Sequence, residues 1–221
     1  MIIKNMRYVK SLVLLGAVLL AGNELMGARE FDDLKTGDLI FKISGGSEFS
    51  DAITSATGTD SLLNFDHVGI IEKTDKDSVV VIEASPRLGV HITPLKEFVD
   101  ETVTINGKPG LVVKRLCGDY PFQKIIERAK TFIGQEYDWW FLPDNGKMYC
   151  SELIYESYLD NEGKHIFQTV PMNFHANDGS MPDFWIELFE KIGEEIPEGK
   201  PGTNPNDLFN SNNLIEILRF F

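Results

Sequence analysis

Cysteine is scarce in this sequence, with only Cys117 and Cys150 among 221 residues. Two cysteines exclude a disulfide scaffold, a four-cysteine zinc site and a cysteine-ligated iron–sulfur cluster. Basic residues are also in the minority, because 21 Lys and Arg stand against 34 Asp and Glu and give a formal net charge of −13. No Lys/Arg cluster follows the first ten residues, so the sequence argues against a nucleic-acid partner and, more weakly, against anionic membrane surfaces.

The sequence also lacks an apolar run long enough to span a membrane comfortably. Its most apolar stretch, residues 11–22, has roughly 12 residues, whereas a helix that crosses the bilayer core needs about 20. Lys4, Arg7 and Lys10 precede this stretch, and small residues end it. A basic start, a short apolar centre and a small-residue end are typical of a secretory signal. A buried N-terminal helix is the alternative.

We therefore expect residues 1–28 to be a signal peptide and residues 29–221 to form a single domain. The mature chain would then function in the periplasm or outside the cell. A lipoprotein signal would need a cysteine at position 23, where the sequence has Asn23. The sequence thus predicts no stable membrane anchor.

Strand-like and helix-like segments are grouped along the chain rather than alternating. Residues 67–73 and 79–84 are rich in β-branched residues and are separated by a polar turn, which predicts an antiparallel hairpin. Further strands are expected at 34–41 (after a turn), 89–95, 110–116 and 214–220, and helices at 49–57, at 121–133, from Cys150 onward and at 184–192. Residues 197–213, rich in Gly, Pro and Asn, are expected to form an ordered loop or a flexible lid. The grouping predicts an α+β fold.

Cys150 is the first candidate for chemistry. It follows a loop and begins an amphipathic helix. A thiol at a helix N-terminus faces the positive end of the helix dipole and free backbone N–H groups, which lower its pKa from about 8.5. The same N–H groups can hold an oxyanion after the thiolate has attacked a carbonyl. A lone cysteine is otherwise often a buried structural residue, and position alone does not decide between the two roles.

His67 and Glu83 supply the base and the orienting group that a cysteine nucleophile needs. In an antiparallel hairpin, the residue numbers of every pair of opposite residues add up to the same sum. His67 and Glu83 share a face only if this sum is an even value near 150 or 152, because an odd sum places them on opposite faces. The odd-length turn at 74–78 allows an even sum. Val79 and Val81 on the face of Glu83 indicate burial, and a buried glutamate needs a partner.

Other uses of these residue types have less support. A zinc site made from His67, Glu83 and Cys150 lacks a fourth ligand at any short spacing, so we expect no metal and no other cofactor. Cys117 closes a predicted strand and is interpreted as a core residue. His91 alternates with apolar neighbours and is expected at the surface.

The candidate residues lie in segments that resemble the circularly permuted branch of the NlpC/p60 papain-like cysteine hydrolases, the YiiX/YebB-like permuted amidases. The segments follow the permuted order histidine, glutamate, cysteine and span most of the chain from residue 36 onward. They are Gly37–Phe41, Asp66–Ile70, Ile82–Ser85, Gly134–Asp138, Tyr149–Tyr155 and Pro205–Leu208. Each segment is a weak signal alone, and the ordered set is fairly specific.

The resemblance implies a papain-like α+β fold, with an antiparallel sheet or a small barrel packed against helices. It also implies that Cys150 is the nucleophile, that His67 is the general base and that Glu83 orients the imidazole. By analogy, Tyr137 lines the substrate pocket or adds an oxyanion donor. Tyr149 stands where the unpermuted peptidases have an acidic residue that holds the substrate's amine, and it is assigned to substrate binding.

The expected function is that of a secreted cysteine hydrolase that cleaves an amide bond through a thioacyl intermediate. The substrate would be a peptidoglycan-derived peptide, or an N-acyl or lipid compound. A second possibility is a lipid deacylase, thioesterase or acyltransferase, in which residues 139–141 (Trp-Trp-Phe) line an apolar acyl pocket rather than the core. A third is a catalytically dead module that binds cell wall or lipid.

Overall fold

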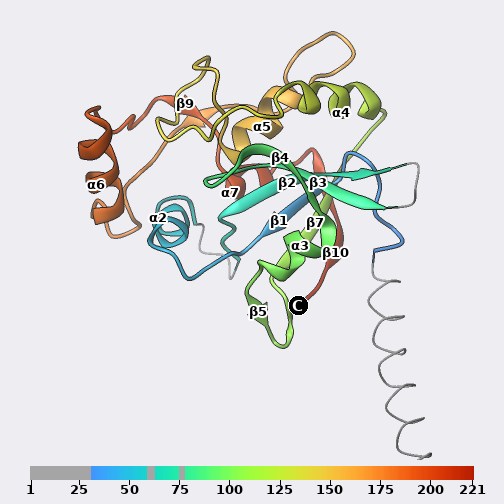
Figure 1. The fold of residues 1–221 in the computed structure, drawn as a ribbon, viewed down its shortest axis with the longest axis horizontal. Helices are drawn as coiled ribbons and strands as arrows, with labels where there is room; N and C mark the ends of the chain where they lie inside the picture. Colours follow the sequence, from blue (N-terminus) through green and yellow to red (C-terminus); the bar gives the residue numbers. More distant parts are fainter. Residues whose placement is uncertain (1–30, 59–62, 75–77) are drawn as a thin grey trace, which may run out of the picture. The chain divides into compact units, whose positions relative to one another are not determined.

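The computed structural model describes residues 31–58, 63–74 and 78–221 (Figure 1). The predicted signal peptide, residues 1–28, lies outside the described residues. Lys35–Phe221 form one unit. Among the helices of the described residues, none is both long and apolar enough to cross a membrane.

The framework of this unit is a six-stranded sheet in the order β10-β7-β1-β2-β3-β4, with every neighbouring pair antiparallel. The predicted α+β fold with an antiparallel sheet against helices is confirmed. The strands are β1 Leu39–Lys42, β2 His67–Lys73, β3 Val79–Ser85, β4 Gly89–Pro94, β7 Leu111–Leu116 and β10 Leu214–Arg219.

The remaining elements are helices and two small strand pairs. The helices are α2 Glu48–Thr57, α3 Leu95–Asp100, α4 Phe122–Thr131, α5 Cys150–Ser157, α6 Asp183–Ile192 and α7 Pro205–Phe209. The small pairs are β5 Thr104–Ile105 with β6 Lys108–Pro109, and β8 Val170–Pro171 with β9 Pro201–Gly202. The sequence did not predict α3, α7 or the small pairs, because each is too short to display a hydrophobic period.

The two faces of the sheet are covered by different helices, as Figure 1 shows for α4 and α5 on one side and α3 on the other. Val68 and Ile70 of β2 belong to the main core, together with Ile126 of α4 and Leu153 of α5. Because side chains alternate along a strand, His67 projects from β2 on the opposite face, where its ring centroid lies 5.8 Å from that of Phe98 in α3.

Close packing fixes the β2–β3 hairpin in its register. Ile70 pairs with Ile82, so partner numbers sum to 152, and the predicted even register is confirmed. A Cβ atom on Gly69 would lie 2.4 Å from Cγ1 of Val81. Glycine at this position therefore allows the two strands to approach.

Residues 197–213, expected to be a loop or a lid, contain β9 and α7. Oδ1 of Asn204 accepts a hydrogen bond from the backbone N–H of Asp207 and caps α7. The amide of Asn206 accepts from the backbone N–H of Phe65 at 2.8 Å and donates to its carbonyl at 2.9 Å. This pairing ties α7 to the segment that leads into β2.

Cys117 is not a core residue, and the prediction that it is one was wrong. The mostly buried residues of β7 end at Leu116, which is 3% exposed. Cys117 follows the last strand residue and is exposed, and both cysteines are free.

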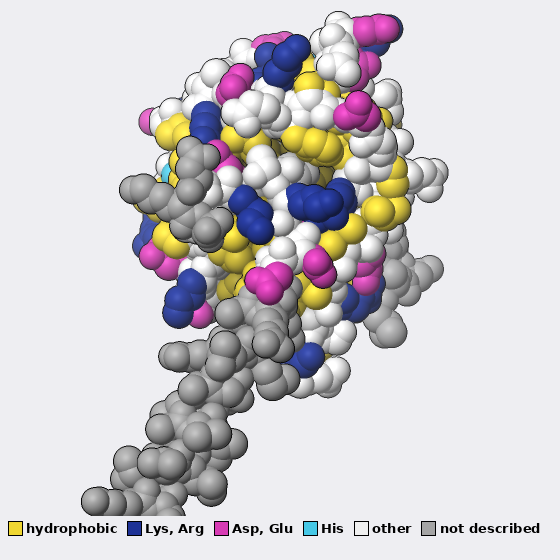
Figure 2. All heavy atoms as spheres, turned by 90° about the vertical axis from the view of Figure 1, so that its right-hand side faces the viewer, with side chains coloured by type: hydrophobic (Ala, Val, Ile, Leu, Met, Phe, Trp, Pro, Cys, Tyr) yellow, Lys and Arg dark blue, Asp and Glu magenta, His cyan; other side chains and the backbone are white. Residues whose placement is uncertain are grey.

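Charges of both signs are mixed on the face shown in Figure 2. Lys and Arg side chains lie beside Asp and Glu there, with apolar side chains between them. On that face, where side chains are coloured, the net charge of −13 does not gather into one large acidic patch.

Candidate active site

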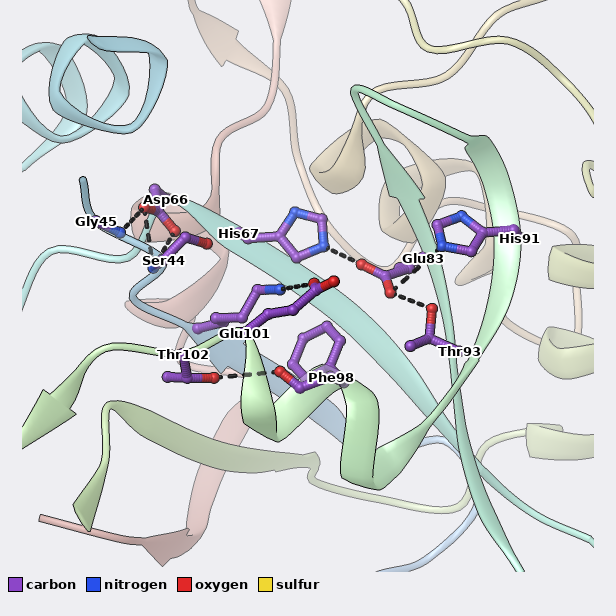
Figure 3. A network of polar contacts seen from close by, with 11 residues as sticks. Ser44, Gly45, Asp66, His67, Glu83, His91, Thr93, Phe98, Glu101 and Thr102 are labelled. Atoms are coloured by element: carbon purple, nitrogen blue, oxygen red, sulfur yellow. Dashed lines mark hydrogen bonds and ion pairs between the residues drawn. The ribbon is translucent and has the colours of Figure 1, made fainter. Parts of the chain in front are cut away.

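His67 and Glu83 form a buried ion pair at the end of the sheet. His67 is the first residue of β2 and is 8% exposed, and Glu83 in β3 is 2% exposed. Nε2 of His67 lies 2.6 Å from Oε2 of Glu83 (Figure 3). The even register places both side chains on one face as diagonal neighbours, as the hairpin argument required.

The carboxylate of Glu83 is held by several groups in addition to His67. Oγ1 of Thr93 in β4 donates a hydrogen bond to Oε1 of Glu83. Burial alone would raise the pKa of Glu83. The hydrogen bond and charge of His67, the Thr93 hydroxyl and the charge of Lys42 together lower that pKa from 4.5 to about 2. Glu83 is therefore ionised at neutral pH.

Cys150 lies at the N-terminus of α5 and is 4% exposed. Burial opposes the charged form of His67. Hydrogen bonds and charge from the Cys150 thiol and from Glu83 outweigh burial and raise the pKa of His67 from 6.5 to about 9. Because Glu83 occupies Nε2, Nδ1 is the ring nitrogen left for the thiol. The structure thus brings the three predicted catalytic side chains together.

The two predicted substrate-binding tyrosines both lie beside Cys150. Tyr137 is buried, and burial, followed by the negative charge of Cys150, raises the pKa of its phenol well above 10. The hydroxyl of Tyr149 accepts a hydrogen bond from the backbone N–H of Thr203 at 3.1 Å, which links the start of α5 to the segment after β9. The substrate contacts of both tyrosines stay predictions.

A small, mainly apolar cavity lies beside the nucleophile. Its lining includes Cys150 and the aromatic side chains of Tyr137, Phe141, Tyr149, Phe174 and Trp185. Of residues 139–141, only Phe141 lines this cavity. The two tryptophans line a second, wider cavity on the other side of Tyr137.

Two residues that line the first cavity each carry a buried donor with no hydrogen-bond partner in the described part of the chain. The donors are Oγ of Ser151, which is 1% exposed, and Nε1 of Trp185, which is 3% exposed. An unpaired buried donor is costly, and an acceptor on a bound molecule would remove that cost.

Two acidic residues that the sequence reasoning did not assign support the start of α5. Asp138 is fully buried and accepts hydrogen bonds from the backbone N–H groups of Trp140 and Leu142, each at 2.9 Å. These bonds shape the loop that precedes the nucleophile. Oε2 of Glu152 lies 3.4 Å from the backbone nitrogen of Tyr149. Burial, followed by the negative charge of Asp138, raises the pKa of Glu152 from 4.5 to about 8.

Sequence reasoning also missed Lys42 and misplaced His91. Lys42 pairs with His67 in the β1–β2 register, is buried, and lies 3.3 Å from the Glu101 carboxylate. His91 was expected at the surface, but its side chain is 22% exposed and Nε2 lies 3.7 Å from Oε1 of Glu83. The signal that could have placed His91 is the β3–β4 register, because Glu83 and His91 are direct partners.

The other two described histidines lie outside this cluster. His165 stacks on Tyr155, with ring centroids 3.9 Å apart. His175 forms an exposed pair with Glu198, with 3.2 Å between Nδ1 and Oε2. Neither contacts Cys150, His67 or Glu83 in the contacts of the described residues.

Residues 33–218 match a family model described as the permuted papain-like amidase enzymes of the YaeF/YiiX, C92 family. The chain belongs to this family. A relative in Escherichia coli strain K12, described as the uncharacterized protein YiiX, is 30% identical over 189 residues, which cover 84% of this chain and 86% of that protein.

One solved structure is also similar to this chain. It is described as the metalloprotein yiiX from Escherichia coli O157:H7 and is 29% identical, with a TM-score of 0.66 over 84% of this chain and 97% of that one. The permuted amidase family is one of amide-bond hydrolases, which agrees with the general activity that the sequence predicted.

A metal ion does not fit the described residues of the permuted amidase site. Nε2 of His67 and Oε2 of Glu83 bind each other, and Oε1 of Glu83 accepts from Thr93. Within residues 31–58, 63–74 and 78–221, no group of three or more His, Cys, Asp and Glu could hold a metal ion. No step of the chemistry below is therefore derived through a metal.

Proposed function

We propose that this protein hydrolyses an amide bond with Cys150 as nucleophile, His67 as general base and acid, and Glu83 as the residue that orients the imidazole. The observation that carries the proposal is the 2.6 Å bond between His67 and the ionised Glu83 carboxylate, together with the hydrogen bond between the Cys150 thiol and His67. This arrangement favours a thiolate–imidazolium pair at neutral pH.

The catalytic cycle follows from these positions. The Cys150 thiolate attacks the carbonyl carbon of the amide, and the oxyanion accepts hydrogen bonds from backbone N–H groups in the first turn of α5. The His67 imidazolium then donates its proton to the amine, which leaves as the C–N bond breaks and a thioacyl enzyme remains. His67 next takes a proton from water, and the hydroxide displaces the thiolate to give a carboxylic acid. Glu83 keeps its charge throughout.

The proposed substrate is a cell-wall peptide or an N-acyl compound that meets the protein in the periplasm or outside the cell. The signal-like residues 1–28 support that location. The family supports cleavage of amide bonds in general.

Alkylation at about pH 6 tests whether Cys150 is a reactive thiolate. Because Cys117 is exposed and free, the parent protein for this test is the Cys117→Ser variant, which leaves Cys150 as the one thiol. We expect iodoacetamide to label this parent much faster than a free cysteine at the same pH, and His67→Ala to remove the advantage. Labelling at the rate of free cysteine would support the catalytically dead module instead.

The apolar cavity favours a second candidate function, that of a lipid deacylase, thioesterase or acyltransferase. Its lining is rich in aromatic side chains, which suits an apolar acyl group. Incubation with muropeptides, N-acyl amides and phospholipids, followed by product analysis, separates the candidates. Cys150→Ala is the blank, and Phe174→Ala should raise KM for acyl substrates while leaving muropeptide cleavage little changed.

A further inference from the structure

His91 is fixed in a defined protonation pattern by its own strand. Nδ1 of His91 lies 2.9 Å from the backbone oxygen of Gly89. A carbonyl oxygen can only accept, so Nδ1 carries a proton. The other nitrogen, Nε2, points at Glu83, 3.7 Å from Oε1. Figure 3 shows the Glu83 carboxylate between the rings of His67 and His91.

The contact between His91 and Glu83 therefore depends on the charge of His91. In neutral His91 the bare Nε2 and the carboxylate oxygen are both acceptors, and no hydrogen bond joins them. In the imidazolium form, Nε2 becomes a charged donor aimed at the carboxylate. The side chain of His91 is 22% exposed and that of His67 is 10% exposed, so His91 has the more direct access to protons from solvent.

We propose that His91 is a positioning residue which, when protonated, draws the Glu83 carboxylate away from His67 and weakens the catalytic pair. The inference rests on the function proposed above. Protonated His91 would compete for the carboxylate that orients His67, so protonation of His91 would reduce the amount of thiolate at Cys150.

The charged groups around Glu83 decide the sign of this effect. His67 on β2, Lys42 on β1 and Cys150 on α5 are the other titratable groups of the cluster, and Glu101 after α3 pairs with Lys42. A positive charge on His91 repels the imidazolium of His67 and neutralises Glu83. Both effects weaken the support that Glu83 gives to the His67 imidazolium.

The test measures Cys150 alkylation against pH in the Cys117→Ser parent, alongside NMR titration of the histidine rings. We expect the rate to show an additional fall on the acid side, by roughly three- to tenfold for a change of up to about one unit in the pKa of His67. The fall should coincide with the NMR titration of His91. His91→Gln, which is neutral at every pH, should remove it, and His91→Phe, which keeps a ring but has no N–H, should do the same.

His175→Gln is the matched control, because His175 also faces a glutamate but is exposed and lies outside the cluster. This variant should keep the profile of the parent. A His91→Gln profile that superimposes on that of the parent, or an acid-side rise in the parent, would overturn the inference while leaving the proposed function intact.

The NMR titration keeps the inference testable even if the parent shows no enhanced alkylation, in which case the proposed function fails. The His67 ring signals should then still shift when His91 titrates, and that shift should vanish in His91→Gln. If the His67 ring signals do not shift when His91 is protonated, this second readout overturns the inference.

Discussion

Glu83 and Glu152 are both buried carboxyl groups near the same thiol, yet their pKa values move in opposite directions. Glu83 is 2% exposed and its pKa falls to about 2, whereas Glu152 is 6% exposed and its pKa rises to about 8. Burial raises the pKa of each, so burial does not explain the difference. The partners do: Glu83 faces His67 and a buried lysine, and Glu152 faces the negative charge of Asp138.

This difference suits the proposed chemistry at Cys150. An ionised Glu83 stabilises the imidazolium that accompanies a thiolate. A protonated Glu152, two residues after the nucleophile, puts no negative charge beside that thiolate at neutral pH. The two glutamates thus keep one charge where it helps and remove another where it would oppose ionisation of the thiol.

The largest effect on activity is expected when the nucleophile or the histidine bound to Glu83 is removed. Cys150→Ala and His67→Ala should each reduce amide hydrolysis by at least roughly 1000-fold, and the double variant should be little worse, because the residues act as one unit. Hydrolysis assays with circular dichroism as the folding control measure this. Near-normal turnover by His67→Ala would mean that another histidine is the base.

Replacing each glutamate by glutamine should separate their roles. Glu83→Gln keeps an acceptor for the ring but loses the charge, so the pKa of His67 should fall. We expect a partial loss of activity, roughly tenfold for each unit of that pKa, and slower alkylation of Cys150 at about pH 6. Glu152→Gln removes a carboxyl that is already neutral at pH 7 and should retain most activity. Equal losses in the two variants would contradict this account.

Stability against pH should show the opposite signs directly. Glu152 binds its proton more tightly in the folded state, so its contribution to stability declines as pH rises from about 4.5 to about 8. Glu152→Gln should therefore gain stability relative to wild type at about pH 9, by up to about 5 kcal/mol. Urea denaturation at about pH 5 and pH 9 measures the difference. A gain of the same size at both pH values would point to packing instead of charge.

The smallest effect is expected for Lys42→Met, which tests how much the Lys42 charge lowers the pKa of Glu83. The methionine keeps an unbranched side chain over Phe98, where the Lys42 ammonium lies 4.3 Å from the ring centroid. Loss of the charge should raise the pKa of Glu83, because Lys42 contributes to lowering it. The acid limb of activity should then move to higher pH by less than about one unit. Lys130→Met, at an exposed ion pair with Glu72, is the control and should leave the limb in place.

Much of this site could be predicted because its key relations are local in sequence. The hairpin that carries His67 and Glu83 is joined by a short turn, so the choice reduced to an even or odd register, and burial of the β3 face favoured the even one. The position of Cys150 at the start of a helix was predicted from the loop that precedes it and from the helical spacing of the apolar residues that follow it. Each prediction needed only neighbours a few residues away.

The rest required contacts between distant segments. Asn206 lies 141 residues from Phe65, whose backbone it pairs with, and no local pattern indicates such a partner. Lys42 becomes a neighbour of His67 only because β1 pairs with β2. The expectation for His91 failed for the same reason, since alternation along β4 does not say what stands on β3.

The amino-acid sequence indicated the strands of the main sheet and the helix that begins at Cys150, because a hydrophobic period acts over short distances. The turn length allowed the register that places His67 and Glu83 on one face, and strand pairing in the structure fixed that register. The tertiary structure decided the charge state of each buried group. A pKa depends on which charges and donors lie within a few ångströms, and in this protein those groups come from β1, β4, α5 and the loop that precedes it.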